Sequence, residues 1–165
     1  MATRMKLSKI CSLLMGLLFA CSASVQLNDP DWYLWMPLYS SACLVNLTSM
    51  VFATSKMIPR IGKPALWLGM FLFAKVAVEG YRHQIAGFWS LDMRERVVRE
   101  KFGSGLVVFS MFLHLEAASK KKGLFTRKDE GGVVKHIELG QMILVGIGYG
   151  MSLVFFVFQK DEMKF

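Results

Sequence analysis

Apolar residues gather in five long runs along this chain, and polar and charged residues gather between the runs. Each run approaches the ~20 residues with which an α-helix crosses the hydrocarbon core of a bilayer. A strand or loop exposed to lipid would leave backbone groups without hydrogen-bond partners, so the runs favour helices. The pattern predicts an all-α, polytopic membrane protein, a bundle of about five transmembrane helices over residues 7–27, 32–54, 65–83, 102–119 and 139–158.

Composition supports this prediction. Apolar residues make up 54% of the chain, against about 45–50% in average proteins. No linker-like stretch or repeat divides residues 1–165, so we expect a single membrane domain. The three cysteines show no C-x-x-C spacing, which favours neither a disulfide framework nor a zinc site.

The net charge of +8 has two interpretations. Nucleic-acid binding is disfavoured, because no basic patch with interleaved aromatic residues lies outside the apolar runs. Basic residues instead collect in cytoplasmic loops of membrane proteins. The N-terminus and the second and fourth loops share one side and carry 12 Lys and Arg, whereas the other side carries seven. This predicts a cytoplasmic N-terminus and a C-terminus outside or in a lumen.

The first run has an alternative interpretation as a cleavable signal peptide, because basic residues lie at its start and the small residues "ACSAS" lie near its end. Against cleavage, Gly16, Ala20 and Ser24 form a stripe of small residues, as in helices that pack closely in membranes. Gly146 and Gly150 form a second such pair. Besides the lipid bilayer, we therefore expect a protein partner or a second copy of the chain to pack on these faces.

An acidic turn, "NDPD", separates the first two runs. One of its aspartates can cap the second helix, because a carboxylate suits a helix N-terminus. The first and third loops lie on the same side of the membrane whichever orientation holds. We therefore predict that the turn docks on the basic segment "MRERVVREK" and forms a polar mouth; the alternative is two separately solvated loops. The candidate residues of this mouth are Asn28, Asp29, Asp31, Arg96 and Arg99.

Charged and histidine residues inside or beside the runs are further candidates. Lys75 and Glu79 would each cost roughly 2.5–3.5 kcal/mol at the centre of an isolated transmembrane helix, and their i, i+4 spacing predicts a pair on one face. Such a pair either neutralises itself or relays protons or solute. Two His-x-Glu pairs invite a metal site, but residues i and i+2 point to different faces of a helix. We expect no metal and no cofactor.

The stretch "VQLNDPD" after a first apolar run resembles the signature of the transmembrane protein 220 family, small polytopic membrane proteins. A weaker likeness runs through "REKFGSGLVV", residues 99–108. The resemblance implies a fold and supplies no reaction.

Together these features predict a small multi-pass membrane protein that acts as an interaction or assembly component. The alternative is a small-solute or proton-coupled carrier that uses Lys75 and Glu79. An embedded enzyme comes third, because no sequence motif indicates a reaction.

Overall fold

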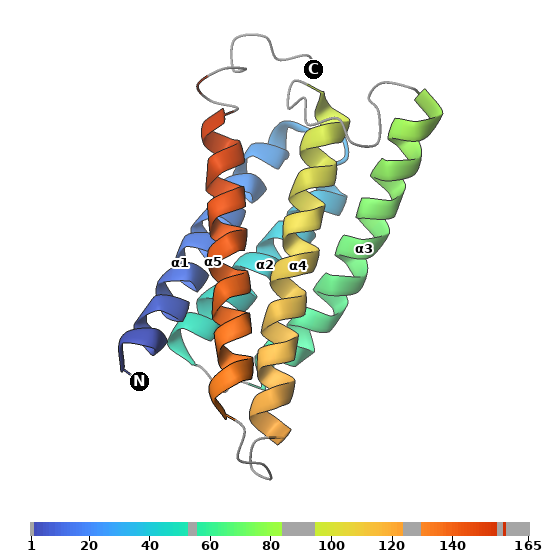
Figure 1. Cartoon of the computed structure of the whole chain (residues 1–165). Helices are drawn as coiled ribbons and strands as arrows, with labels where there is room; N and C mark the ends of the chain where they lie inside the picture. Colours follow the sequence, from blue (N-terminus) through green and yellow to red (C-terminus); the bar gives the residue numbers. More distant parts are fainter. Residues whose placement is uncertain (1, 53–55, 84–94, 124–129, 155–156, 158–165) are drawn as a thin grey trace.

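All regular structure in the described part of the chain is helical (Figure 1). The computed structural model describes residues 2–52, 56–83, 95–123, 130–154 and 157. Five α-helices and one short 3₁₀-helix follow each other along the chain. They are α1 (Ala2–Val25), η1 (Gln26–Asn28), α2 (Trp32–Val51), α3 (Met57–His83), α4 (Arg96–Gly123) and α5 (Glu130–Val154). The predicted all-α bundle of about five helices is confirmed.

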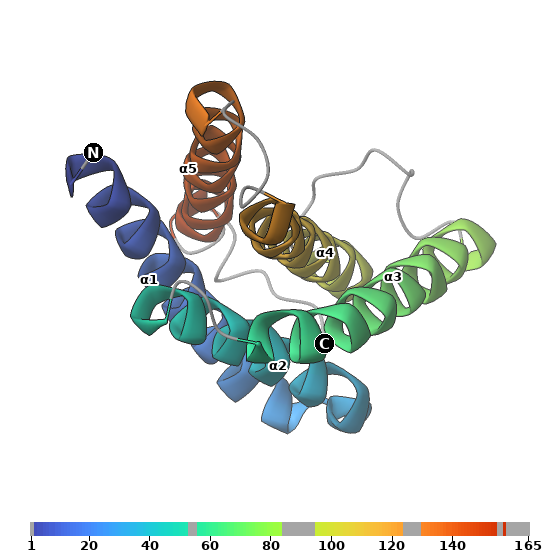
Figure 2. The same ribbon diagram turned by 90° about the horizontal axis from the view of Figure 1, so that it is seen from below.

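The helices form a ring in the order of the sequence. α1, α3 and α5 run toward one end of the bundle, and α2 and α4 run back (Figure 1). Seen along the bundle, α2 lies between α1 and α3, and α4 lies between α3 and α5 (Figure 2). The most extensive packing joins α3 to α4 and α1 to α2, while α5 has smaller contacts with α1 and α4. α1 begins at one end of the bundle, and α5 ends at the opposite end (Figure 1).

The core is centred on α2, which contacts α1, α3 and α4. Trp35, Leu38 and Ala42 on this helix are fully buried. By length and composition α1, α3, α4 and α5 are apolar enough to cross a membrane, and α2 is not among them. The neighbouring helices bury much of α2, so fewer of its side chains must meet lipid. Its aromatic residues Trp35 and Tyr39 are buried in this central position.

Several helices start before the apolar runs do. The predicted starts at 65, 102 and 139 were too late, since α3, α4 and α5 begin at Met57, Arg96 and Glu130. The second helix ends at Val51 rather than at 54. Hydropathy marks the part of a helix that crosses hydrocarbon, whereas backbone hydrogen bonding continues into the polar turns at its ends.

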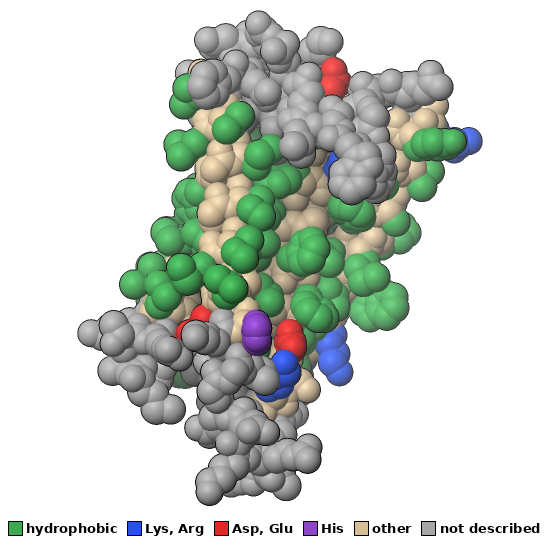
Figure 3. Space-filling model, in the orientation of Figure 1, with side chains coloured by type: hydrophobic (Ala, Val, Ile, Leu, Met, Phe, Trp, Pro, Cys, Tyr) green, Lys and Arg blue, Asp and Glu red, His purple; other side chains and the backbone are tan. Residues whose placement is uncertain are grey.

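Apolar side chains also cover the outside of the bundle. Large exposed residues such as Trp67, Phe71, Phe109 and Phe112 face outward from α3 and α4. On the face shown in Figure 3, apolar side chains fill the middle, and charged side chains lie toward the ends. This distribution is that of helices surrounded by lipid.

The close approach of α2 and α4 at Gly103 is testable. A Cβ at Gly103 would overlap the Tyr39 hydroxyl, whereas a Cβ at Gly105 would stand 3.7 Å from Phe73 Cε2 in ordinary contact. We expect Gly103→Ala to lower the free energy of unfolding by about 1–3 kcal/mol through overpacking. Gly105→Ala should be neutral or stabilising by up to ~1 kcal/mol, because alanine is the better helix former. Unfolding in mixed micelles measures both, and Tyr39→Phe should partly rescue Gly103→Ala. Equal effects of the two alanine variants would contradict the close approach.

Candidate functional site

Asp31 connects three helices at one end of the bundle. Its carboxylate accepts hydrogen bonds from Arg96 Nη2 on α4, at 3.0 and 3.1 Å from the two oxygens. Lys75 Nζ on α3 lies 3.4 Å from Asp31 Oδ2, and Trp35 Nε1 on α2 donates to the same oxygen at 3.3 Å. The carboxylate therefore ties the start of α2 to α3 and to α4.

Arg96 in turn bridges two carboxylates. Its Nε donates to Glu100 Oε1 at 2.7 Å, one turn further along α4. Glu100 is only 2% exposed, and a buried carboxylate without a partner would be strongly unfavourable. The guanidinium group suits this position because it presents several N–H donors in a planar fork. We call Asp31, Lys75, Arg96 and Glu100 the ion cluster.

The acidic turn does not cap α2 in the expected way. Asp31 occupies the N-cap position, but its side chain makes no capping hydrogen bond. A backbone hydrogen bond closes the first turn of α2, because the Leu34 N–H donates to the Asp31 carbonyl at 3.0 Å. The Asp31 side chain is thereby left for Trp35 and for the two cationic groups.

The electrostatics of the cluster stabilise the charged form of Asp31. Burial by itself raises the pKa of this carboxyl group. The hydrogen bond from Trp35 and the positive charges of Arg96 and Lys75 together outweigh burial, so the pKa of Asp31 lies below its ordinary value. Asp31 is therefore a carboxylate throughout the physiological pH range.

Two of the predicted residues of the polar mouth are seen to meet. Asp31 and Arg96 are in direct contact, and Asp29 directly follows η1, its backbone N–H bonded to the Gln26 carbonyl. Arg99 is half-buried on α4. Asn28 ends η1, and its side chain is outside the described part. Arg94 of the basic segment also lies outside the described residues.

The intramembrane pair has a different arrangement from the one predicted. Lys75 forms its ion pair with Asp31 on another helix, and no Lys75–Glu79 ion pair occurs within the described ranges of α3. Glu79 is half-buried one turn further along that helix. The i, i+4 spacing predicts partners on the same helix, whereas the carboxylate that Lys75 contacts is that of Asp31, in the turn before α2.

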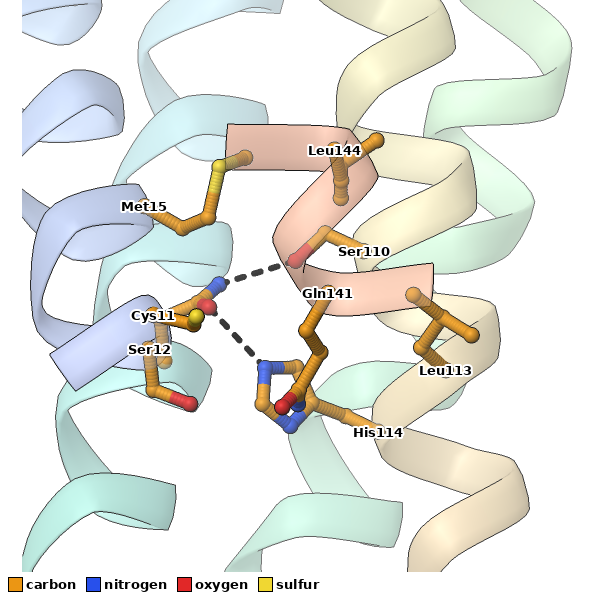
Figure 4. A pocket seen from close by; sticks show the side chains of 9 residues that line it. Cys11, Ser12, Met15, Ser110, Leu113, His114, Gln141 and Leu144 are labelled. Carbon is orange, nitrogen blue, oxygen red and sulfur yellow. Dashed lines mark hydrogen bonds between the residues drawn. The ribbon is translucent and has the colours of Figure 1, made fainter. Parts of the chain in front are cut away.

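A second polar cluster was not predicted from the sequence. Asn46 on α2 donates from Nδ2 to Ser110 Oγ on α4 at 3.1 Å, and its Oδ1 lies 2.9 Å from His114 Nε2 (Figure 4). These three residues are at most 5% exposed. The position of Asn46 within an apolar run could have indicated this cluster, because buried polar groups in membrane helices require hydrogen-bond partners. His114 was considered only for its His-x-Glu spacing.

This cluster borders a narrow crevice between α1, α2, α4 and α5 (Figure 4). Met15, Leu113 and Leu144 form part of its apolar lining. Its hydrogen-bonding groups, which define what we call the polar crevice, are those of Cys11, Ser12, Asn46, Ser110, His114 and Gln141. Across the described ranges, no group of three or more His, Cys, Asp or Glu residues could hold a metal ion.

Comparison with known proteins identifies a family. The model of the family described as "Transmembrane family 220, helix" matches residues 18–116, three-fifths of the chain. The match includes the acidic turn, α2, α3 and most of α4, and it confirms the resemblance seen in "VQLNDPD". No curated protein and no solved structure matches the chain.

The ion cluster predicts a specific order of mutational effects. Asp31→Asn removes one acceptor, whereas Arg96→Gln also leaves Glu100 buried without its cation, so Arg96→Gln should cost more stability. A double-mutant cycle between Asp31 and Arg96 should give a coupling of about 0.5–3 kcal/mol. Adding Glu100→Gln to Arg96→Gln should recover part of the loss. Thermal unfolding in detergent measures these changes, with Arg60→Gln at an exposed position as control. Additive single effects would show that Asp31 and Arg96 are not coupled.

The lowered pKa of Asp31 gives the cluster a defined pH response. Because its pKa is lower in the folded state, the charged Asp31 stabilises the protein above its ordinary pKa of ~3.9, and this stabilisation is lost as the pH falls through the folded value. The difference in Tm between the native protein and Asp31→Asn should stay constant from about pH 7 to pH 5 and shrink only below about pH 4. A difference that already disappears near pH 6 would contradict this.

Proposed function

The chain belongs to transmembrane family 220, and we propose that this multi-pass membrane protein acts as an assembly component that packs against a second copy of itself through α5. The observation that carries the proposal is the outward position of Gly146 and Gly150. A Cβ added to either glycine meets nothing within 4 Å. Ile143 and Ile147, on the same side of the helix, are exposed as well.

The other glycines of α5 differ from this pair. A Cβ at Gly148 would come within 2.7 Å of Leu18 Cδ2 on α1, and one at Gly140 would come within 3.0 Å of Leu113 Cδ2 on α4. Those two glycines serve packing inside the chain. Gly146 and Gly150 leave a shallow strip on the outer face that no described part of the chain fills.

Small residues spaced by four promote helix association in lipid, because they let two backbones approach closely where no hydrophobic effect drives the helices together. A second copy suits this strip, since a two-fold axis brings the same strip of both chains into contact. α5 also has the lowest buried share of the four candidate spans, 17%. It is therefore the helix with most surface left for a neighbour.

The stripe on α1 offers less to a partner. Gly16 is buried, and a Cβ there would lie 3.1 Å from Leu47 Cδ2 of α2. Ala20 and Ser24 are exposed, but the Ser24 hydroxyl bonds to the Cys21 carbonyl of its own helix. Met15 and Phe19 of α1 belong to the core, so the intact protein includes this helix in its packing.

Charge distribution supports an N-terminus in the cytoplasm. The N-terminal segment and the segments around the second and fourth loops carry 12 Lys and Arg against seven on the other side, and α1 begins at that end of the bundle (Figure 1). The ion cluster then lies at the outer or lumenal end. No observation favours the alternative function of a carrier using Lys75 and Glu79, because Asp31 holds Lys75.

Native mass spectrometry from mild detergent, together with cross-linking in intact membranes, tests the assembly. The native protein should appear as a dimer or a higher oligomer. Gly146→Leu with Gly150→Leu should weaken association at least about tenfold, equivalent to ~1.4 kcal/mol, while the Tm of the monomer stays unchanged because neither new side chain meets the chain's own atoms.

Ala74→Leu adds bulk to an exposed position on α3 and serves as the matched control, which should remain oligomeric. A native protein that is monomeric in both measurements would refute the proposal. So would a doubly substituted protein that associates as well as the native one. A stoichiometric foreign protein lost with the same two substitutions would assign the strip to a different partner.

A further inference from the structure

The polar crevice lies within the bundle, nearer to the end at which α1 begins. Ser12 comes from α1, Asn46 from α2, His114 from α4 and Gln141 from α5. The side chains of Ser12, His114 and Gln141 point toward a common space (Figure 4), which Asn46 also lines. Polar side chains from four helices converge at a depth where water is scarce, which indicates a site rather than incidental polarity.

Hydrogen bonds determine the proton position on His114. Asn46 Nδ2 donates to the Ala42 carbonyl at 2.9 Å and to Ser110 Oγ at 3.1 Å, so the Asn46 oxygen must face His114. This oxygen can only accept, and His114 Nε2 at 2.9 Å must therefore carry the proton. In the neutral ring, Nδ1 is then an acceptor.

Ser12 provides a donor on the opposite side of the same space. Its side chain is 3% exposed and is directed into the crevice without a hydrogen bond to any residue drawn there (Figure 4). Other serines of the bundle, such as Ser22 on the same helix, bond to a carbonyl of their own helix. Gln141 accepts from Ser8 Oγ at 2.8 Å, which leaves its amide NH₂ as the donor end.

The crevice in this state is closed. None of the gaps between its side chains holds a water-sized sphere. A molecule that reached Ser12 and His114 would meet a hydroxyl group and a ring nitrogen, Nδ1, each of which can take part in a hydrogen bond.

We propose that the polar crevice binds a small neutral molecule that donates to His114 Nδ1 and accepts from Ser12 Oγ, and that α5 moves outward to admit it. The molecule is neutral because no Lys, Arg, Asp or Glu is among the described residues that line the crevice, and an unpaired charge is strongly disfavoured in such surroundings. This binding goes beyond the proposed assembly and does not depend on it.

α5 is the movable wall for structural reasons. Within the described residues its main contacts are with α1 and α4, and its candidate span is 17% buried against 28% or more for the other three. Two polar contacts join it to α1, Gln141 to Ser8 and the Tyr149 hydroxyl to the Leu14 carbonyl at 2.9 Å. An outward shift of α5 breaks these contacts and leaves the α2–α3–α4 core intact.

Cys11, which lines the crevice and is buried, provides a reporter. In a Cys21→Ser, Cys43→Ser background it is the remaining thiol, and its rate of modification by the neutral reagent methyl methanethiosulfonate measures opening. Acetamide serves as the neutral probe with a donor and an acceptor, and acetate as its charged counterpart of the same size. We expect acetamide to slow the modification of Cys11 with a saturable dependence and acetate to have no such effect.

Ser12→Ala separates binding from folding. It should raise the half-saturating acetamide concentration at least about fivefold while leaving Tm unchanged or higher, because it removes a hydroxyl that makes no hydrogen bond with the other residues that line the crevice (Figure 4). Ser22→Ala is the matched control and should leave the acetamide dependence unaltered. The Gly146→Leu, Gly150→Leu protein should also keep the acetamide effect, which separates this site from assembly.

Three results would overturn the proposal. Cys11 that stays unmodified would show that α5 does not open. Protection that never saturates, or that acetate produces equally, would show the absence of a neutral site. A lower Tm for Ser12→Ala would show that the hydroxyl serves the fold itself.

Discussion

The need to satisfy polar groups where water is scarce governs this structure. Lipid provides no hydrogen bonds, so a polar side chain inside the bundle is tolerated only with partners on its own or a neighbouring helix. Arg96 meets this requirement at one end by holding Asp31 and Glu100 together. Asn46 meets it nearer the other end with Ser110 and His114. Apolar packing fills the space between, and the two polar clusters limit which rotations of the helices are acceptable.

The two clusters differ in what they leave unsatisfied. In the ion cluster, the charges of Arg96 and Lys75 offset those of Asp31 and Glu100, and the contacts are made within the chain. This arrangement stabilises the bundle and offers little to a ligand. The polar crevice is neutral, and Ser12 is directed into it without a hydrogen bond to the other residues drawn (Figure 4). The ion cluster thus ties helices together through charge, whereas the crevice that sequence reasoning overlooked brings uncharged polar groups from four helices together.

Glycine positions divide the surfaces of α5 in a similar way. Gly140 and Gly148 allow α4 and α1 to approach closely, whereas Gly146 and Gly150 have no neighbour in the described structure. One helix therefore has an inner face used for the fold and an outer face available for assembly. Because α5 is also the least buried of the candidate spans, the same helix is the one that can move with least disruption of the core.

The amino-acid pattern alone predicted the helices, the family and which loops lie on the same side of the membrane, because the length of an apolar run and the number of runs do not depend on how the helices are rotated. On that basis Asp31 and Arg96 were expected at the same end of the bundle. The contacts themselves became visible in the folded bundle, where Arg96 contacts Asp31 directly, Lys75 pairs with Asp31 from another helix, and Asn46 faces His114. Periodicity shows which residues share a face of one helix, but the rotation of that face relative to its neighbours follows from packing of the whole bundle, and hydrogen-bond partners depend on that rotation.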